Sequence, residues 1–373
     1  MKILFPFVGD SIGGSHLSTI SLYNHLKQNG YDVVIVLHYK QSVLADYLNQ
    51  QKIKYKTLNA PYLAGSSPKI IMIFFGMILN SYSFIKFIKN NNIDIVHGND
   101  LRINLSWSIA SKLSNAKYVW HQRTILSTSV FWKFIAYLCD HFISSSRVVF
   151  CSSPGNISAN RKSLIYNAFN TDKKYDKKLT RESINTKYPN CKNKYLVGYV
   201  GRLIDYKNIK FLIECLPEVI NKGNKSFHLL IIGNGKKEYV SYLKRIANKL
   251  NLHNNIDFVG FVHDPVELIS GLDLLVASSG VDAFGRTIVE SMLQSTPVLA
   301  ANKGGHLEII EDKVDGLLYE VNSKSSFTYK ILKLADDPSY GYGLTKKALK
   351  KCSSTYTTDN MLKGIERVYR SLI

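Results

Sequence analysis

Cysteine is scarce in this chain of 373 residues, and its five cysteines follow no disulfide or metal motif. They stand at positions 139, 151, 191, 215 and 352, with no Cys-x-x-Cys pair. An odd, scattered set of cysteines is typical of reduced thiols in the cytosol and argues against a disulfide framework. Histidine, cysteine and aspartate do not cluster at metal-ligand spacing either, so the sequence predicts no metal and no cofactor.

Membrane-spanning and secretory patterns are also missing. The apolar run at residues 70–79 is shorter than the ~20 residues that cross a bilayer. Residues 1–8 combine one lysine and a proline in a short apolar run, without a small-residue cleavage site. That composition is unlike a signal peptide and favours a buried strand. We therefore expect a cytoplasmic protein.

Glutamate is absent from the first 165 residues, which hold 13 Lys and 4 Arg against 6 Asp. This half supplies much of the net charge of +20. Such a basic half can bind nucleic acid, an anionic membrane or a pyrophosphate-bearing substrate, or it is a solvated lysine-rich surface. The chain shows no helix-turn-helix pattern, RNP aromatic motif or zinc finger, so we expect no nucleic-acid partner.

The length of the chain exceeds that of a typical single hydrophobic core and favours two domains. In the first half, segments with strand character alternate with helical ones. Strands are expected at residues 3–8, 32–38, 93–97, 116–121 and 147–152, and a helix at residues 17–29. Strands separated by helices predict βαβ units and a parallel sheet.

A charged stretch without apolar periodicity, residues 171–194, is predicted to be a linker or surface loop. The alternation then resumes. Strands are expected at residues 196–200, 228–232, 256–259, 274–278 and 298–301, and helices at 208–221 and 238–250. This pattern predicts two doubly wound, Rossmann-like α/β domains at residues 1–165 and 166–352, with a final helix within residues 353–373.

Two segments of the first domain, residues 70–79 and 130–138, are apolar all around a helix. Such helices belong to a domain core, or they lie against a bilayer with aromatic and basic residues at the headgroups. The second segment contains Trp132, Lys133 and Tyr137. Because both segments fall in the basic half, we favour contact with an anionic inner-membrane surface, with a core location as the alternative.

The most informative stretch is residues 278–305, where two acidic residues stand eight positions apart. Asp282 precedes a Phe-Gly turn, and Glu290 follows within an apolar helix start. Two carboxylates at a loop–helix junction can hold hydroxyl groups at two ends of one ligand, while N–H groups of the helix start bind an anion between them. A nucleotide sugar, with its sugar hydroxyls, diphosphate and ribose, has this shape.

This stretch resembles the acidic motif of the retaining glycosyltransferases of family 4, which have the GT-B fold. The motif usually reads Glu-x7-Glu with Gly-Phe-Gly after the first Glu, whereas Asp282 and Ala283 stand here. The resemblance implies two Rossmann-like domains facing across a cleft, with the last helix crossing back to the first domain. It assigns Asp282 to a hydroxyl of the donor sugar and Glu290 to the ribose.

Other segments of the second domain match the same family. Arg202 and Lys207 lie in a segment that looks like its Gly-Arg…Lys motif, and the resemblance directs both cations to the departing diphosphate. Gly233 matches a glycine that lines the nucleotide in the family, and residues 258–262 match the segment whose backbone contacts the base. The residues expected around the donor in this domain are Gly201, Gly233, Val262, Phe284, Gly285, Arg286, Thr287 and Ile288.

In the first domain, Gly13 and Gly14 resemble the family's glycine turn after the first strand, where the backbone approaches the diphosphate. The resemblance also places His121 near the donor sugar, while His97 is predicted to be structural. The catalytic candidates are Arg202, Lys207, Asp282, Glu290 and His121, and those on the acceptor side are Ser15, His16 and Arg123.

The resemblance implies a metal-independent, retaining glycosyl transfer from a UDP- or GDP-linked sugar. The implied acceptor is a glycan linked to lipid pyrophosphate, in O-antigen, capsule or exopolysaccharide assembly at the cytoplasmic face of the inner membrane. Two alternatives remain, an inactive scaffold subunit of the same fold and a nucleotide-sugar 2-epimerase. The presence of Arg202, Lys207 and Glu290 argues against the scaffold, and the acidic motif with the Gly13-Gly14 turn favours transfer over epimerisation.

Overall fold

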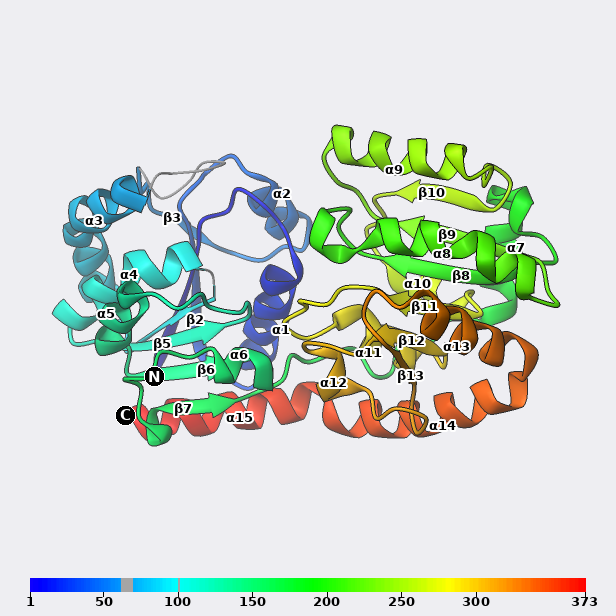
Figure 1. Cartoon of the computed structure of the whole chain (residues 1–373). Helices are drawn as coiled ribbons and strands as arrows, with labels where there is room; N and C mark the ends of the chain where they lie inside the picture. Colours follow the sequence, from blue (N-terminus) through cyan, green and yellow to red (C-terminus); the bar gives the residue numbers. More distant parts are fainter. Residues whose placement is uncertain (62–69, 100) are drawn as a thin grey trace. The chain divides into compact units, whose positions relative to one another are not determined.

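A computed structural model of the chain describes residues 1–61, 70–99 and 101–373. It contains two compact units, each built around a parallel β-sheet with helices on both faces (Figure 1). Unit 1 comprises Met1–Ala168 together with Thr358–Ile373, and unit 2 comprises Phe169–Thr357. The expectation of two doubly wound α/β domains is therefore confirmed.

The described part of unit 1 has seven parallel strands in the order β3-β2-β1-β4-β5-β6-β7. Their bounds are β1 Lys2–Phe7, β2 Asp32–Leu37, β3 Lys56–Thr57, β4 Ile95–Gly98, β5 Lys117–Gln122, β6 His141–Ser144 and β7 Lys162–Leu164. The helices are α1 Gly14–Gln28, α2 Val43–Gln50, α3 Ile70–Asn90, α4 Leu101–Leu113, α5 Val130–Leu138, α6 Arg147–Cys151, η1 Ala159–Arg161 and α15 Thr358–Leu372.

Alternate side chains of β1 enter two hydrophobic cores, one on each face of this sheet. Ile3, Phe5 and Phe7 pack with residues of α1, α2 and α15. Leu4 and Val8 pack on the other face with residues of α3, α4 and α5. Because successive side chains of a strand point to opposite faces, a central strand covered on both sides is apolar at every position.

The last helix, α15, belongs to unit 1 and completes one of its cores with Met361 and Ile365. The hydroxyl of Tyr31 donates to Glu366 Oε1 of this helix at 2.9 Å. A Cβ at Gly364 would lie 3.2 Å from the Ile165 side chain. The chain thus returns to its first unit after building the second.

Unit 2, described throughout, has six parallel strands in the order β10-β9-β8-β11-β12-β13. Their bounds are β8 Tyr195–Val200, β9 Phe227–Ile232, β10 Ile256–Gly260, β11 Leu274–Ala277, β12 Val298–Ala301 and β13 Leu317–Tyr319. The helices are α7 Lys177–Lys187, η2 Pro189–Cys191, η3 Asp205–Lys207, α8 Ile209–Lys222, α9 Lys237–Lys249, α10 Pro265–Ser270, α11 Arg286–Leu293, α12 His306–Ile309, α13 Lys324–Asp336 and α14 Pro338–Thr355. The central strand β8 sends Val197 into the larger core and Leu196 into a smaller core on the opposite face.

One predicted strand is wrong. Residues 147–152 contain helix α6, because Ser146 caps a helix start: its Oγ accepts a hydrogen bond from Val149 N at 3.2 Å. The Val-Val-Phe sequence of this helix has strand propensity, but the cap and the tertiary packing override it. The strand of this region is β6, which precedes α6 and is entirely buried.

The prediction of a linker or loop at residues 171–194 is also wrong in part, because helix α7 occupies its centre. Asp176 caps this helix by accepting a hydrogen bond from Leu179 N at 2.9 Å. Ile184 anchors the helix in the smaller core of unit 2. One buried isoleucine among charged residues is too weak a periodic signal to indicate a helix.

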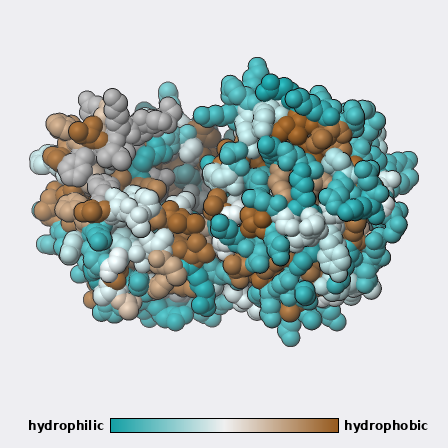
Figure 2. Space-filling view, viewed as in Figure 1, coloured by the Kyte–Doolittle hydropathy of each residue, from teal (hydrophilic) through white to brown (hydrophobic). Residues whose placement is uncertain are grey.

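Helices α3 and α5 each have a buried side and an exposed side. The buried sides include Met77, Phe84 and Ile88 of α3 and Ile135 of α5. The exposed sides, here called the apolar face, consist of Ile71, Met72, Phe75, Ile78, Leu79 and Tyr82 of α3 and Val130, Phe134 and Tyr137 of α5. Figure 2 shows hydrophobic residues in brown over the part of unit 1 where these helices lie. Among the described helices, none is both long and apolar enough to cross a bilayer.

Candidate functional site

The predicted site residues of unit 2 lie at the carboxyl ends of its strands, where open α/β sheets bind their ligands. Arg202 and Lys207 follow β8, Gly233 follows β9, and Asp282 lies between β11 and α11. The strand order β9-β8-β11 makes these three segments neighbours along one edge of the sheet. Residues far apart in the sequence are thereby brought into contact.

Lys207 and Asp282 form an ion pair, although the resemblance implies that they bind different parts of a ligand, the diphosphate and the donor sugar. Lys207 Nζ donates to Asp282 Oδ1, and the two side chains are 21% and 17% exposed. Ser278 Oγ, just after β11, donates to the backbone oxygen of Lys207 at 2.7 Å. The loop after β8 and the loop after β11 therefore hold the pair jointly.

His306 completes this cluster and was not among the predicted site residues. Its Nδ1 lies 3.0 Å from the carbonyl oxygen of Ala301, and its Nε2 lies 3.4 Å from Asp282 Oδ2. The ring is fully buried at the start of α12. The one signal in the sequence is its position directly after the Gly304-Gly305 pair.

The Asp282 carboxyl is held in its charged form. Burial by itself would raise its pKa, but the hydrogen bond from His306 and the positive charge of Lys207 lower the pKa to about 2. A carboxylate accepts hydrogen bonds and cannot donate them. Asp282 is therefore suited to accept from ligand hydroxyl groups throughout the neutral pH range.

The two glycines at positions 304 and 305 allow the Asp282 loop to approach α12. Gly305 N donates to the backbone oxygen of Asp282 at 2.7 Å. A Cβ at Gly304 would lie 2.9 Å from that oxygen, and a Cβ at Gly305 would lie 2.5 Å from Phe284 Cα. Any side chain at either position would displace the backbone that carries the carboxylate.

Glu290, the second predicted acid, lies in α11 and pairs with Arg286 one turn earlier. Arg286 Nη2 donates to Glu290 Oε1 at 3.3 Å. Burial raises the pKa of Glu290, and the charge of Arg286 opposes this shift in part. Arg286 also stacks over Phe169, with its guanidinium carbon 4.6 Å from the ring centre. Each of the two predicted acids thus has a cationic neighbour.

The predicted donor-binding residues at the start of α11 differ in how far their side chains are buried. Gly285, the N-cap, has φ +121, a left-handed value that favours glycine. Thr287 is partly exposed, whereas Phe284 packs against Tyr356 with ring centres 5.5 Å apart. The Ile288 side chain is fully buried, and its N–H donates to Gly285 O at 3.0 Å. The Ile288 side chain therefore belongs to the core, and its expected contact with the nucleotide stays a prediction.

The loop after β8 and the loop after β9 are in direct contact through their backbone atoms. A Cβ at Gly233, whose φ is +140, would lie 1.8 Å from Gly201 O, so a side chain at 233 is sterically excluded. Arg202 is exposed, and its Nη2 donates to the Tyr206 hydroxyl at 2.9 Å. Val262, after β10, is half-buried against the smaller core.

In unit 1, the predicted Gly-Gly-Ser-His segment forms the start of α1, with Gly13 as its N-cap. Gly13 N donates to His16 Nδ1 at 3.1 Å, and the carbonyl of Ser15 accepts from Thr19 Oγ1 at 2.8 Å. His16 is buried, with its ring centre 5.8 Å from that of Phe7. His16 thus caps the helix through its side chain, and Gly14 is exposed at the helix start, while the expected acceptor contact of His16 stays a prediction.

His121 and Arg123, from the end of β5, lie in a polar cluster inside unit 1. His121 Nδ1 lies 3.1 Å from Nε2 of the fully buried His97. Arg123 donates to the side-chain oxygens of Asn167 and, at 3.3 Å, of Asn99. The guanidinium is thus held by these two side chains, and its expected contact with an acceptor stays a prediction.

Three side chains of unit 2 lie close enough together to hold a metal ion, although their spacing along the chain does not follow a metal-binding motif. Ligand atoms of Cys191, His228 and Asp257 lie within 4.8 Å of one another. His228 Nε2 is 3.0 Å from Asp257 Oδ2, and burial raises the pKa of the Cys191 thiol to about 12. The cluster lies near the amino ends of β9 and β10, away from Asp282.

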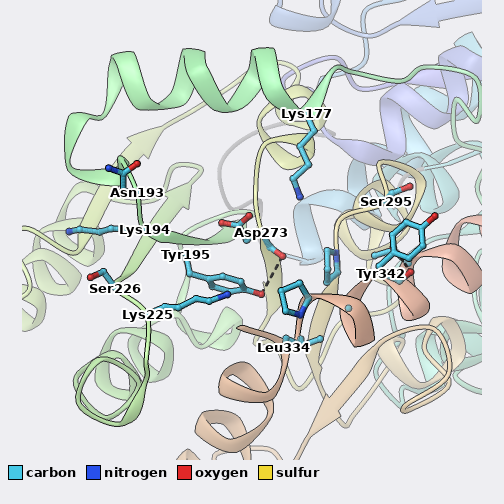
Figure 3. A pocket seen from close by; sticks show the side chains of 14 residues that line it. Lys177, Asn193, Lys194, Tyr195, Lys225, Ser226, Asp273, Ser295, Leu334 and Tyr342 are labelled. Atoms are coloured by element: carbon cyan, nitrogen blue, oxygen red, sulfur yellow. Dashed lines mark hydrogen bonds between the residues drawn. The ribbon is translucent and has the colours of Figure 1, made fainter. Parts of the chain in front are cut away.

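A cavity of about 480 Å³ also opens at the amino-terminal edge of the sheet in unit 2 (Figure 3). Lys194 and Asp273 stand directly before β8 and β11, and Lys225 stands two residues before β9. Lys177 points toward the cavity from α7. None of the predicted site residues is among the described residues that line it. In a parallel sheet the amino ends of the strands lie at one edge and the carboxyl ends at the opposite edge. The cavity lies at the amino edge and the Asp282 cluster at the carboxyl edge, so the two are distinct.

Two protein families match the chain. The family described as "Glycosyl transferase 4-like" matches residues 8–133, and "Glycosyl transferases group 1" matches residues 180–352. A poly(ribitol-phosphate) alpha-N-acetylglucosaminyltransferase of Staphylococcus aureus is 28% identical over 178 residues, which are 47% of this chain and 35% of that protein. An uncharacterized glycosyltransferase of Methanocaldococcus jannaschii is 24% identical over 394 aligned residues, covering 100% of this chain and 99% of that protein.

The chain spans less than half the length of several curated relatives that it matches. Among solved structures, Anabaena HepE in complex with UDP and glucose superposes with a TM-score of 0.85, covering 100% of both chains at 22% identity. This likeness shows a common fold. Since one family model matches most of unit 1 and the other most of unit 2, the chain belongs to the family-4-like glycosyltransferases of the GT-B fold.

Proposed function

We propose that the chain is an active, retaining and metal-independent glycosyltransferase that moves a sugar from a nucleotide sugar to a glycan acceptor. The observation that carries this proposal is the cluster of Lys207, Asp282 and His306 at the carboxyl edge of the sheet in unit 2. It places a carboxylate held in its charged form, and a lysine, on loops from two adjacent strands. These charged groups are suited to bind the hydroxyl and phosphate oxygens of a donor, which favours an enzyme over an inactive scaffold.

Each polar group of unit 2 has a role in binding the donor under this proposal. Asp282 accepts a hydrogen bond from a hydroxyl of the sugar, and Glu290 accepts from the ribose hydroxyls. Lys207 exchanges part of its contact with Asp282 for the diphosphate, to which Arg202 and the N-terminal end of α11 also contribute. The crystal structure of HepE with UDP supports a uridine nucleotide as the first candidate.

The proposed transfer needs no side chain as nucleophile. The bond between the anomeric carbon and the phosphate oxygen breaks, and its electron pair stays with the nucleoside diphosphate. The acceptor hydroxyl forms the new bond on the same face, and its proton passes to the departing phosphate oxygen. Arg202 and Lys207 stabilise the negative charge that develops on that phosphate, a task that fixed cations perform without a metal.

A nucleotide panel tests the donor site directly. We expect one of UDP, GDP, CMP, ADP and dTDP, with UDP first, to raise the melting temperature by a few degrees, since a ligand present at 100 times its Kd contributes about 2.7 kcal/mol. In Glu290→Ala this shift should fall to near zero. The measurement is thermal unfolding followed by fluorescence, with and without each nucleotide.

Glu214→Ala is the matched control, because Glu214 also forms an (i,i+4) pair, with Lys210, on another helix of unit 2. It should keep the full nucleotide shift. If no nucleotide stabilises the folded wild-type chain, the donor site does not exist and the inactive scaffold becomes the better description. If the donor is converted to an epimer without acceptor, the 2-epimerase is correct.

We propose that the apolar face of unit 1 lies against an anionic bilayer that carries a lipid-linked acceptor. Phe75 and Ile78 are 64% and 61% exposed, and Val130 of α5 is 79% exposed. Lys86 and Lys133 lie on the same two helices, and the unit is rich in basic residues. Apolar side chains combined with lysines favour the interface of an anionic membrane, in which this protein would be peripheral and cytoplasmic.

Replacing Phe75 and Ile78 by serine should abolish binding to vesicles that contain anionic phospholipid, with little change in melting temperature because both side chains are exposed. Sedimentation with vesicles of phosphatidylglycerol and phosphatidylcholine measures the bound fraction. A double replacement of Leu179 and Tyr329 by serine, two exposed side chains of unit 2, should leave binding intact. Equal binding by all three proteins would contradict the proposal.

A further inference from the structure

Inside unit 1, buried polar side chains connect the end of β5 to the last helix of the chain. Tyr369 of α15 contacts His97 of β4, and His97 contacts His121 of β5. The Tyr369 hydroxyl lies 2.5 Å from His97 Nδ1, and His97 Nε2 lies 3.1 Å from His121 Nδ1. All three side chains are at most 1% exposed. Their hydrogen bonds are therefore made with one another and not with solvent.

Arg123 determines the direction of these hydrogen bonds. Its Nη2 lies 3.4 Å from His121 Nδ1, and a guanidinium can only donate. His121 Nδ1 must then be an acceptor, so the proton of the neutral ring is on Nε2. The facing nitrogen, His97 Nε2, carries its own proton and donates to His121 Nδ1, because two unprotonated nitrogens at 3.1 Å would repel.

Tyr369 completes this assignment at the other side of His97. With the proton on Nε2, His97 Nδ1 is an acceptor, and the Tyr369 hydroxyl is its donor. The reverse set of tautomers would require Nδ1–H on His121, directed at both His97 and the guanidinium of Arg123. One assignment therefore satisfies the geometry: the Tyr369 hydroxyl donates to His97, and His97 donates to His121.

Both imidazoles are held neutral by their surroundings. Burial lowers the pKa of His97 to about 3, and the positive charge of Arg123 adds to the effect. Burial, Arg123 and the neighbouring His97 lower the pKa of His121 well below its usual value. His121 Nε2 is buried without a hydrogen-bond partner among the described residues. An N–H at this atom is a donor that the protein itself does not use.

We propose that Tyr369 and His97 are positioning residues that hold His121 as a neutral ring with its proton on Nε2, ready to donate a hydrogen bond to a substrate oxygen. This inference rests on the proposed glycosyl transfer for the identity of that substrate. A buried donor without a partner is costly to the folded protein, and a ligand that accepts from it removes this cost. The C-terminal helix would thereby contribute to the site through its Tyr369 hydroxyl.

The tautomers themselves are measurable without any substrate. Long-range proton–nitrogen correlation spectra of protein labelled with ¹⁵N-histidine distinguish Nδ1–H, Nε2–H and doubly protonated rings. We expect His97 and His121, assigned with His97→Gln and His121→Gln, to show only the Nε2–H form at pH 7. A Nδ1–H or doubly protonated His121 would overturn the inference, whatever the activity of the enzyme.

Tyr369→Phe tests the positioning role, because it removes the hydroxyl and keeps the ring. His97 Nδ1 then has no donor, so we expect His97 to populate both neutral tautomers and His121 to lose its pure Nε2–H signal. The kcat for nucleoside diphosphate release should fall by up to about 10²-fold, the order of effect for a misplaced catalytic group. The KM for the donor should change much less if the His121 contact forms mainly in the transition state.

Tyr31→Phe is the matched control, since it also removes a hydroxyl that bonds α15, at Glu366, but lies outside the histidine pair. It should leave the histidine spectra and kcat unchanged. A Tyr369→Phe protein with wild-type tautomers and wild-type kcat would refute the positioning role. If both variants lose kcat equally while the spectra stay unchanged, α15 acts only through stability. If no nucleotide sugar is turned over, the spectra still decide the tautomer assignment, and the proposed function fails separately.

Discussion

Replacing Lys207 by alanine is expected to slow the release of nucleoside diphosphate from the donor by about 10²–10³-fold, the loss typical of removing one group that stabilises developing negative charge. Lys207 is less exposed than Arg202, which lies on the surface beside Tyr206. The measurement is kcat/KM for diphosphate release, with the donor identified by the nucleotide panel. Lys207→Arg should recover only part of the rate, because its planar group does not reproduce the contact of a compact ammonium.

The same change also leaves Asp282 without its strongest partner. We expect a loss of about 1–2 kcal/mol in the free energy of unfolding, between the values for exposed and fully buried pairs. Asp282→Ala in the Lys207→Ala background should restore part of this stability and none of the activity. This contrast separates the structural role of the pair from its catalytic role.

Lys210→Ala is the matched control, because Lys210 follows Lys207 closely and forms an exposed pair with Glu214. It should keep wild-type kcat/KM. A Lys207→Ala enzyme within a factor of about three of wild type would show that the lysine is only a partner of Asp282. The diphosphate would then depend on Arg202 and on the backbone at the start of α11.

Acidification from pH 6.5 to 5.5 is expected to lower the free energy of unfolding of unit 1 by about 3 kcal/mol, because three buried histidines each contribute about 1 kcal/mol over this interval. Burial lowers the pKa of His38 to about 4 and of His97 to about 3, and the pKa of His121 is also well below its usual value. The unfolded chain then binds more protons than the folded one. The stability from these rings is complete well above pH 6.5 and is lost as the pH falls through 6.5 toward these values.

Tryptophan fluorescence can follow this loss in unit 1, because the three tryptophans of the chain, at positions 107, 120 and 132, all belong to that unit. Urea unfolding at pH 7.5, 6.5 and 5.5 gives the slope. His38→Gln should reduce the slope by about one third, since glutamine can replace both the hydrogen bond to Leu58 O and that from Trp107 Nε1. A slope that is flat in this range, with unit 1 folded, would mean that these rings are already protonated in the folded state.

Much of the fold followed from local patterns. Strand β12 coincides with the predicted residues 298–301, and the other predicted strands of unit 2 are within a residue of those observed. Apolar runs bounded by glycine and polar residues predict such strands because buried parallel strands are apolar on both faces. The prediction failed at α6 and α7, where a single capping side chain determined the local structure.

The candidate site was only partly predictable, because its residues interact over long distances in the sequence. Asp282, Glu290, Arg202 and Lys207 are recognisable by motif spacing, but the ion pair between Lys207 and Asp282 joins positions 75 residues apart. His306 belongs to the cluster through its contact with Asp282, and a histidine after two glycines has no meaning by itself.

The sequence alone determined the α/β class, the two domains and the acidic loop–helix segment, because these depend on periodicity and on residues close together in the chain. Only the tertiary structure decided which side of α3 is exposed, and which charges are paired. It also decided that Tyr369 lies beside His97, which is 272 residues away in the sequence. Such contacts depend on how a sheet orders its strands and where the last helix packs, and these are properties of the whole folded chain.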